Sequence, residues 1–404
     1  MNRRNFLAAA TLPALAPIFS PLRSYAQETK PSDALRITRV EPYVLRIGKR
    51  APIPCCRVET AEGIHGWGEG TSPPTTPAIV TQIRESGKLL IGQSAWDIEG
   101  HWTAIYTREF NTLGGTLFAA MSAIDLALWD IVGKKLGVPV YKLLGGRAIP
   151  ANKSIRIYAS GPWGSLPRTR AAYAERTREL VSKGVMAGKT DPFGGTPLDR
   201  HLPTPTLNEV REIVAGMREG GPNFDICIEA HGKFNAASAG RIAKTLEPFD
   251  PYFLEEPVPA ENMDAMAEVQ RSTSIPIATG EGLQSHYPYR ELLQKQAARI
   301  LQPDAARVGG ITPMKKIAAM AETHYVNVAP HNPNGPVCTA ASLHLVTSIA
   351  NFAILEQGNT DTTMYKDIFP GGWTPSNAEM WVPEAPGLGV DFSPQFVKEH
   401  SVAV

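Results

Sequence analysis

Three glutamates stand at equal intervals along the chain, each at the end of an apolar run. Glu229 lies in ICIEAHG, Glu255 in PYFLEEP and Glu281 in PIATGEG, so each glutamate follows the previous one by 26 positions. One strand, one helix and two loops take about that many residues in an α/β protein. The spacing therefore predicts three successive strands of a parallel barrel, each of which delivers one carboxylate to the same rim.

Three carboxylates that converge on one point repel one another, and they ionise together only around a cation. A set of carboxylate oxygens suits a hard ion, and Mg²⁺ is the best match. Any one of these glutamates, taken alone, could instead cap a helix or form a salt bridge. Their common phase favours a metal site with one Mg²⁺ per subunit.

From residue 152 to residue 357 the chain alternates between strand-like and helix-like segments. The strand-like runs are SIRIYAS, VMAGKTD, FDICIEA, PYFLEE, IPIAT, ARILQPD, YVNVAPH and FAILEQ. Amphipathic segments such as TLNEVREIVAGMRE and TPMKKIAAMAET lie between them and have helical spacing. This order predicts an α/β fold, a (β/α)7-8 TIM-type barrel, in which seven or eight repeating units are both allowed. The active site of such a barrel forms at the carboxyl ends of its strands.

An N-terminal α+β capping domain is expected over residues 27–151. The segments RITRVEPYVLRI and CCRVETAEGIHGWGEGT have the pattern of antiparallel strands with a glycine-rich turn, and a long apolar helix that ends at Gly137 and Pro139 follows them. The last segment, residues 358–404, is rich in proline and glycine and has little periodicity. We expect it to pack back on the capping domain.

Residues 1–26 have the pattern of a twin-arginine signal peptide. Arg3 and Arg4 precede an apolar stretch, and a small-residue cleavage site ends at Ala26. The stretch is too short, and too often interrupted by proline, for a stable membrane span, and an uncleaved anchor is the alternative. The pattern predicts a periplasmic protein without membrane contact after cleavage. The twin-arginine route carries folded proteins, which suits an enzyme that receives its metal before export.

The composition is that of an ordinary soluble globular protein. Of the 404 residues 43% are hydrophobic and 20% are charged, and the formal net charge is +1. A charge so near zero gives no electrostatic reason to expect a nucleic-acid partner or an anionic membrane surface. The four cysteines are too few for a disulfide framework and lack the spacing of a metal site.

Besides the three glutamates, several other ionisable side chains follow the predicted strands at the same rim. In chain order they are Lys189, Asp191, His231, Asp304, His331 and Glu356. Each alone has a structural explanation, since a histidine or lysine after a strand can be a turn or surface residue. Asp191 before Pro192 is as well placed to form a turn as to act in a site. Their concentration at one rim favours a shared active site.

This set of residues, together with several longer segments, resembles the enolase superfamily. The segments are SAIDLALWDIVGKKLGVPVYKLLGG, FLEEPV, GEGL, QPDAARVGGIT and HNPNGP. Within the superfamily the chain is most similar to the mandelate racemase/muconate lactonizing enzyme family, and there to galactonate-type acid-sugar dehydratases. The resemblance covers about residues 36–400, and together these motifs are highly specific.

The resemblance implies roles for the rim residues. Glu229, Glu255 and Glu281 match the family's metal ligands, while His331 matches the base on the seventh strand and Asp304 its partner on the sixth. A histidine is suited to remove a proton at neutral pH, and an aspartate can orient its ring.

Three further residues match the groups that handle the rest of the reaction. Lys189 matches the first lysine of the family's Lys-x-Lys motif, which with the metal stabilises an enediolate. His231 matches an acid that some dehydratases place two residues after the first metal ligand. Glu356 matches a carboxyl group at the end of the eighth strand that contacts the enolate.

Two positions depart from the family pattern. The first metal ligand is commonly aspartate, and Glu229 is one methylene longer. The second lysine of Lys-x-Lys is replaced by Asp191, which leaves no base on that face for two-base racemisation. One base at His331 and one acid at His231 suit elimination instead.

We therefore expect a Mg²⁺-dependent dehydratase that converts a sugar acid, either an aldonate or an aldarate, into a 2-keto-3-deoxy acid. The alternative enzyme is a cycloisomerase or epimerase of a sugar lactone or anhydro-sugar acid, which would quench the same enolate without loss of water. A third hypothesis is an exported binding or scaffold protein that kept the fold and lost its activity. The complete set of rim residues argues against it. The resemblance also implies a homo-oligomer, from dimer to octamer.

Overall fold

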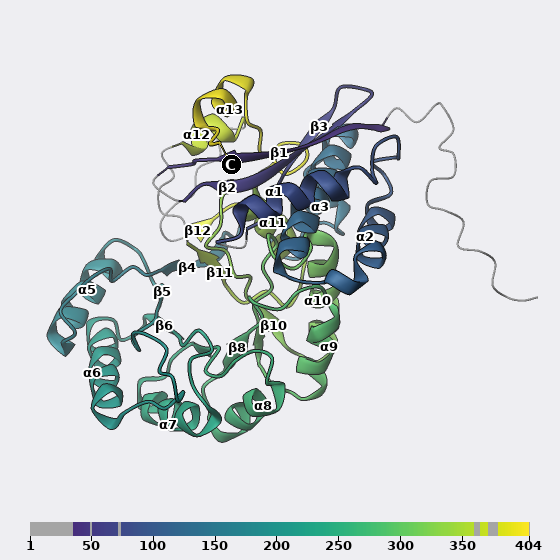
Figure 1. Ribbon diagram of the computed structural model, residues 1–404. Helices are drawn as coiled ribbons and strands as arrows, with labels where there is room; N and C mark the ends of the chain where they lie inside the picture. The colour runs from purple at the N-terminus through teal and green to yellow at the C-terminus, as the bar shows by residue number, and fades with distance from the viewer. Residues whose placement is uncertain (1–34, 49–50, 72–73, 359–363, 371–378, 404) are drawn as a thin grey trace, which may run out of the picture.

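The computed structural model describes residues 35–48, 51–71, 74–358, 364–370 and 379–403 (Figure 1). The predicted signal peptide, residues 1–26, lies outside these residues, as does part of the predicted C-terminal segment. Export of the protein therefore stays a prediction.

The N-terminal part is a three-stranded antiparallel sheet, paired in the order β1-β2-β3, with helices against it. Its elements are β1 (Ile37–Leu45), β2 (Ile53–Thr60), β3 (His65–Glu69), α1 (Thr76–Gly87), α2 (Ile98–Arg108), the 3-10 turn η1 (Phe110–Thr112), α3 (Gly115–Leu136) and α4 (Val140–Leu143). The helix α3 ends where the sequence predicted, because Gly137 takes the left-handed conformation (φ 67°) that closes a helix.

Helix α3 lies directly against strand β3 because both surfaces carry small residues. A Cβ atom at Gly66 would come within 2.0 Å of the carbonyl oxygen of Ala127, and one at Gly68 within 1.7 Å of that of Ala123. Among the described residues α3 is the one helix long and apolar enough to cross a membrane, but 83% of its most apolar window is buried inside the protein. The close packing identifies it as a core helix.

The larger part is a sheet of eight parallel strands that curls into a barrel, which confirms the predicted fold class. The strands are β4 (Ile155–Ser160), β5 (Ala187–Thr190), β6 (Asp225–Glu229), β7 (Phe253–Glu255), β8 (Ile277–Thr279), β9 (Ile300–Leu301), β10 (Asn327–Val328) and β11 (Leu355–Gln357). They pair in the order β10-β9-β8-β7-β6-β5-β4-β11. An isolated parallel bridge between Val328 and Phe352 joins the two ends of this path.

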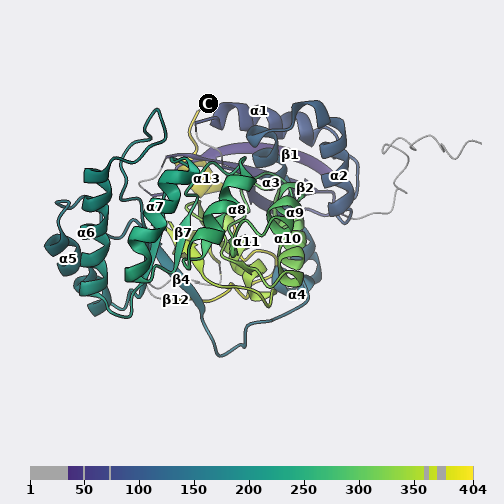
Figure 2. The same ribbon diagram turned by 90° about the horizontal axis from the view of Figure 1, so that it is seen from below.

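Seven helices connect the eight strands in the described part of the barrel, so the repeat is (β/α)7 followed by a final strand. They are α5 (Arg170–Ser182), α6 (Thr204–Gly220), α7 (Ala236–Leu246), α8 (Met263–Ser272), α9 (Tyr287–Gln294), α10 (Ile311–Thr323) and α11 (Pro336–Thr347), and the 3-10 turn η2 (Glu247–Phe249) follows α7. Both views place the N-terminal sheet and its helices at one side of the barrel (Figures 1 and 2).

The described helices of the C-terminal segment lie beside the N-terminal sheet, whereas its strand lies at the barrel (Figure 1). It contains α12 (Tyr365–Ile368), β12 (Glu379–Met380), which pairs antiparallel with β4, and α13 (Pro394–His400). The N–H of Val402 donates to the carbonyl oxygen of Val44 (2.8 Å), and the rings of Trp67 and Phe392 meet edge to face at 4.9 Å. The chain thus returns from the barrel to β1.

Glu69, at the end of β3, connects the N-terminal sheet to the barrel. Its buried carboxylate accepts hydrogen bonds from the N–H groups of Gly335 (2.6 Å) and Cys338 (3.1 Å), at the start of α11. The first N–H groups of a helix have no partner within the helix, and a carboxylate there is also favoured by the helix dipole. The N-terminal domain therefore anchors the loop that precedes α11.

Asp130 in α3 joins three segments of the fold. Its carboxylate accepts hydrogen bonds from the N–H groups of Trp67 in β3 (3.0 Å) and Leu388 in the C-terminal segment (2.8 Å), and it pairs with Lys134 Nζ (2.7 Å). Burial raises the pKa of Asp130, and the charge of Lys134 opposes the shift.

We expect Asp130→Ala to lower the free energy of unfolding by about 3 kcal/mol, because two buried N–H groups and the Lys134 ammonium lose their acceptor. Urea unfolding measures the loss. Lys135→Ala, which removes an exposed ion pair with Glu62, is the control and should cost less than about 1 kcal/mol. Equal losses in the two variants would contradict this account.

The burial of His344 makes the stability of the protein depend on pH. The ring is fully buried in α11, its Nδ1 accepts from the N–H of Tyr141 (3.3 Å), and burial lowers its pKa to about 4. Because the folded-state pKa lies below the ordinary value of 6.5, protonation favours the unfolded chain. The stability that this group contributes at neutral pH is therefore lost as the pH falls from about 6.5 toward 4.

Between about pH 7.5 and about pH 5 this one group should remove about 2 kcal/mol of stability. His344→Asn keeps an acceptor for the N–H of Tyr141 but does not titrate, so the variant should lose about that much less stability than the wild type over the same range. Urea unfolding at both pH values tests this, and parallel losses in the two proteins would exclude His344 as the cause.

Candidate active site

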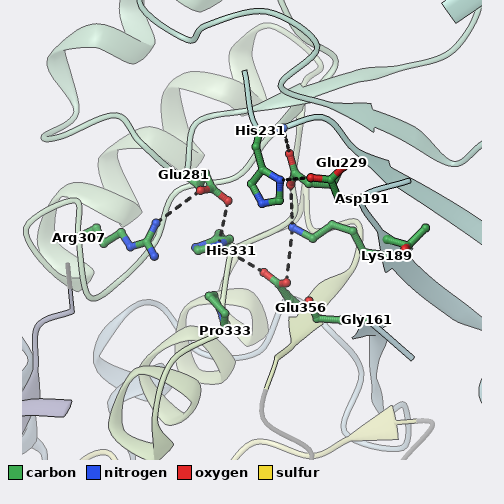
Figure 3. Close-up of a pocket in the computed structure, with 12 residues that line it drawn as sticks. Gly161, Lys189, Asp191, Glu229, His231, Glu281, Arg307, His331, Pro333 and Glu356 are labelled. Carbon is green, nitrogen blue, oxygen red and sulfur yellow. Dashed lines mark hydrogen bonds and ion pairs between the residues drawn. The ribbon is translucent and has the colours of Figure 1, made fainter. Parts of the chain in front are cut away.

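A pocket of about 360 Å³ opens at the carboxyl ends of the parallel strands (Figure 3). Six of the eight residues singled out as site residues from the sequence line it. They are Lys189, Glu229, His231, Glu281, His331 and Glu356. The other two lie directly beneath, since Glu255 is bonded to Lys189 and Asp304 to His331. The structure thus brings all eight together, as the strand phase predicted.

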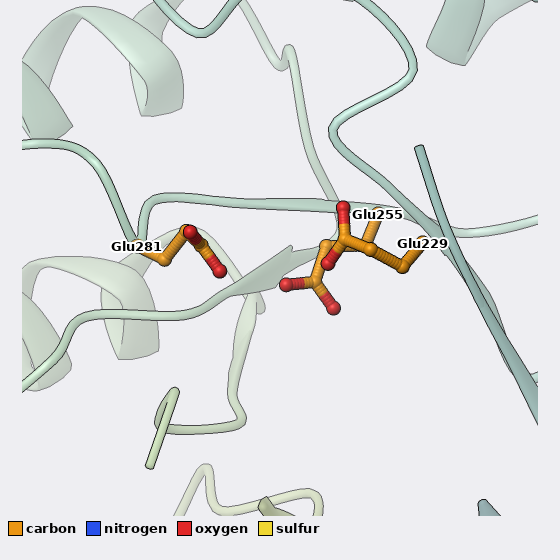
Figure 4. Close-up of side chains that lie close together, drawn as sticks. All are labelled: Glu229, Glu255 and Glu281. Carbon is orange, nitrogen blue, oxygen red and sulfur yellow. The ribbon is translucent and has the colours of Figure 1, made fainter. Parts of the chain in front are cut away.

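The three glutamates of the even spacing converge (Figure 4). Glu229 and Glu255 lie opposite each other in the register of β6 and β7, and Glu281 is in the loop after β8. One carboxylate oxygen from each lies within 4.8 Å of the others. Oxygens this close could be drawn together onto one small cation, and carboxylate oxygens are the ligands that a hard ion prefers. The donor set and its geometry fit a hard divalent cation.

Lys189, at the end of β5, compensates the charge of these carboxylates. Its buried Nζ lies 2.9 Å from both oxygens of Glu255, 3.2 Å from Glu229 Oε2 and 3.5 Å from Glu356 Oε1. Burial alone would lower the pKa of Lys189, but the charges of Glu255 and Glu356 outweigh it and raise the pKa well above its usual value. The lysine is therefore a permanent cation in the floor of the pocket.

The pKa values of the triad show how strongly the carboxylates crowd one another. Burial, together with the charge of Glu229, raises the pKa of Glu255 well above its ordinary value, and burial also raises that of Glu229 against the opposing charge of Lys189. Burial acts on Glu281 in the same direction, but the charge of His331 outweighs it and lowers the pKa. A bound divalent cation would relieve this repulsion.

His331 follows β10 and forms a pair with Asp304, which follows β9. Its Nδ1 lies 2.7 Å from Asp304 Oδ2, and its Nε2 lies 2.9 Å from Glu281 Oε2. Burial lowers the pKa of His331, but the charges of Glu281 and Glu356 outweigh it and raise the pKa to about 10. A cation bound to Glu281 would offset the carboxylate charge that raises the pKa of His331, so the ring could then lose its Nε2 proton and act as a base.

Asp304 is fixed from several sides. Its oxygens accept from Asn334 Nδ2 (2.9 Å) and from the N–H of Ala306 (2.7 Å), and Arg307 Nε lies 3.4 Å away. Burial raises its pKa, and the hydrogen bond from His331 and the charge of Arg307 outweigh burial and lower it. Asp304 thus stays anionic and determines which ring nitrogen of His331 faces the pocket.

Across the pocket, His231 forms a second histidine–aspartate pair. Its Nδ1 lies 2.6 Å from Asp191 Oδ2, and the same oxygen accepts from Lys233 Nζ. Asp191 Oδ1 also accepts from the N–H of Phe193 (3.0 Å). The sequence left open whether Asp191 forms a turn or belongs to the site. In the structure it does both.

Glu356, at the end of β11, lies between the two cationic groups. Its oxygens are 3.5 Å from Lys189 Nζ and 3.8 Å from His331 Nε2, and it accepts from the N–H of Asn332 (3.0 Å). Burial raises the pKa of Glu356, but the charges of Lys189 and His331 outweigh it, so the pKa is lowered. A carboxylate so placed can contact a substrate between the lysine and the histidine.

Sequence reasoning missed three residues of this site. They are Lys233, Arg307 and Asn334. Each lies two or three positions after a residue that was identified, so proximity in sequence to His231, Asp304 and His331 was the available signal. Trp163 and His286, which follow strands of the barrel, do not line the pocket.

A second cavity, of about 290 Å³, adjoins the pocket under the N-terminal domain. The two share Arg307 and Pro333, and the second is also lined by residues 51–54. Residues 51–54 of the N-terminal domain thus line a cavity that adjoins the pocket.

Comparison with known proteins identifies the family. Residues 36–145 match the mandelate racemase / muconate lactonizing enzyme N-terminal domain, and residues 172–396 match the enolase C-terminal domain-like family. The D-galactonate dehydratase of Ralstonia pickettii is 34% identical over 380 residues, which are 91% of this chain and 94% of that protein. The D-gluconate dehydratase of Thermoproteus tenax is 33% identical over 347 residues, 85% of this chain and 69% of that protein.

Comparison with solved structures identifies the same family. A mandelate racemase/muconate lactonizing enzyme-like protein from Rubrobacter xylanophilus superposes with a TM-score of 0.82 at 34% identity, covering 91% of this chain and 98% of that chain. Another from a Roseovarius species has a TM-score of 0.84 at 31% identity, over 91% of this chain and 96% of that chain. The resemblance inferred from the motifs is confirmed: the chain belongs to the mandelate racemase/muconate lactonizing enzyme family and is an enzyme of the enolase superfamily.

Proposed function

We propose that the protein is a Mg²⁺-dependent hydro-lyase that dehydrates a sugar acid to a 2-keto-3-deoxy acid. One observation supports this most directly: two histidines, His331 and His231, line the pocket (Figure 3), and each is bonded through Nδ1 to an aspartate. They follow the third and the seventh strand of an eight-stranded ring, which lie on opposite sides of it. Elimination needs a base on one side of the substrate and an acid on the other.

His331 takes the first step in this proposal. Its Nε2 removes the α-proton, and the electron pair of the broken C–H bond forms the carbon–carbon double bond of an enediolate. The second negative charge then falls on the substrate carboxylate, near the Lys189 ammonium. Asp304 holds the imidazolium that results.

His231 completes the elimination. An electron pair of the enediolate forms a double bond between the α- and β-carbons, and the bond between the β-carbon and its oxygen breaks. The leaving oxygen takes a proton from His231 Nε2 and departs as water. The enol product then tautomerises to the 2-keto-3-deoxy acid. Asp191, which replaces the second lysine of the family motif, gives its carboxylate to His231 and is not placed to act as a second α-carbon base.

Glu229, Glu255 and Glu281 would hold the Mg²⁺, which when bound supplies positive charge next to the substrate carboxylate. The residues around it orient the substrate and exclude a second base. The polar lining suits a polyhydroxylated acid, and the relatives named above carry the names D-galactonate and D-gluconate dehydratase. We therefore propose an aldonic acid as the substrate.

Proton NMR in D₂O tests the reaction. The Mg²⁺-loaded protein, incubated with D-galactonate, D-gluconate, D-xylonate and a panel of aldarates and lactones, should form a 2-keto-3-deoxy acid from at least one of them. His331→Asn should abolish both product formation and α-proton exchange. His286→Asn, a histidine outside the pocket, is the matched control and should retain activity.

Two other outcomes of the NMR experiment would overturn dehydration. A deuterated isomer that keeps every oxygen would show a cycloisomerase or epimerase acting through the same enolate. No exchange and no product from any acid, in a protein that also fails to bind Mg²⁺, would favour the exported binding protein.

Calorimetry tests the metal site. We expect Glu255→Gln to weaken Mg²⁺ binding at least about tenfold, because it removes one of three carboxylate ligands. Glu209→Gln changes a partly exposed glutamate that pairs with Arg168 and should leave the affinity unchanged. Equal affinities for the two variants would contradict the assignment of the triad.

A further inference from the structure

Asp191 and Lys233 form an ion pair behind His231. The proposed reaction does not yet explain the role of this pair. The side chain of Lys233 is 8% exposed and that of Asp191 21%. Lys233 Nζ donates to Asp191 Oδ2, the oxygen that also lies 2.6 Å from His231 Nδ1. A buried lysine needs a carboxylate partner, and here that partner is shared with the histidine.

The backbone of His231 is also held in a fixed conformation. Its φ is +48°, in the left-handed region that residues other than glycine rarely adopt, and its N–H donates to Glu229 Oε1 (2.6 Å). A non-glycine residue persists in this conformation only where its surroundings impose it, and such residues gather at functional sites. The imidazole is thus fixed at the backbone and at Nδ1, while more than half of the side chain is exposed to the pocket.

We propose that Asp191 and Lys233 are positioning residues for the elimination step. Asp191 accepts a hydrogen bond from the Nδ1–H of His231, so that Nε2 is the ring nitrogen that faces the β-hydroxyl of the substrate. Lys233 keeps Asp191 in place from the side away from the pocket. This inference rests on the proposed role of His231, and it gives Asp191 a function that its lysine counterpart in the family motif could not perform.

The hydrogen-bonding groups explain why an aspartate is needed. Oδ1 accepts from the N–H of Phe193, so Oδ2 is left to accept from both His231 and Lys233. An asparagine that keeps the bond from Phe193 would turn its NH₂ group toward the ring. His231 Nδ1 would then have to accept, which only the neutral ring can do, and a neutral ring gives up its Nε2 proton far less readily than the imidazolium that Asp191 supports.

The first test reads the tautomer without any substrate. In protein labelled with [¹⁵N]histidine, long-range ¹H–¹⁵N NMR should show a proton on His231 Nδ1 in the wild type and none on that nitrogen in Asp191→Asn, with His231→Asn identifying the signal. Asp199→Asn is the matched control, because Asp199 forms the same kind of turn in the same loop, with the N–H of His201. A proton retained on His231 Nδ1 in Asp191→Asn would overturn the proposal.

The second test separates elimination from proton abstraction. With D-galactonate, D-gluconate and D-xylonate as probes, Asp191→Asn should lower kcat for dehydration by about 10²- to 10⁴-fold while α-proton exchange continues. The 3-deoxy-3-fluoro analogues lose fluoride, which needs no proton from His231, so their kcat should fall far less. Equal losses with both leaving groups would mean a general structural role and would overturn the proposal.

A double variant, Asp191→Asn with Lys233→Met, removes the lysine that Asp191→Asn leaves without its carboxylate. It should show the same loss of dehydration with the same retained exchange, which excludes misfolding as the cause. If the wild type releases no water from any probe, the proposed function fails in that experiment, whereas the tautomer measurement still decides the roles of Asp191 and Lys233.

Discussion

The crowding of carboxylates at one rim of the barrel is the constraint to which the rest of the site responds. The strands fix the positions from which Glu229 and Glu255 extend, so the backbone cannot move apart to relieve their repulsion. The charge is compensated locally instead, by Lys189 against Glu255 and by His331 against Glu281. Removing either cation would leave a buried charge uncompensated, which costs far more than the pair contributes when intact. The demand for positive charge that remains is what a divalent metal ion would meet.

The N-terminal domain affects the residues at this rim indirectly, through Glu69. Glu69 binds the first N–H groups of α11, and the loop that carries His331 runs directly into that helix. Its position depends in turn on β3, which is held tightly against α3 by the glycine–alanine contact at Gly68 and Ala123. The packing of a sheet outside the barrel is therefore linked, through one buried carboxylate, to the position of the proposed base. This explains why the chain combines the two parts in one fold.

Much of this could be predicted from the sequence, because the barrel repeats a simple pattern. Period and spacing suffice to predict parallel strands, and residues that end successive strands must converge, so the meeting of Glu229 with Glu255 followed from phase. The pairing of Asp304 with His331 was implied by the resemblance to the family. Contacts made within loops could not be predicted in this way. Lys233 lies beyond the strand, and its contact with the loop after β5 depends on backbone turns that have no periodic signal. The shape of the second cavity was beyond reach for the same reason.

The replacement of lysine by aspartate at position 191 changes what one face of the barrel can do. The third and seventh strands lie opposite each other in a ring of eight, so side chains at their ends reach a bound acid from opposite sides. A lysine at position 191 would place a second base on the side of His231, and a substrate could then be deprotonated on one face and reprotonated on the other. Asp191 instead binds His231 and Lys233, which removes a free base from that face and fixes the proposed proton donor there. The hydrogen bonds of this one residue thus support the proposal that a β-hydroxyl is lost and that the α-carbon is not inverted.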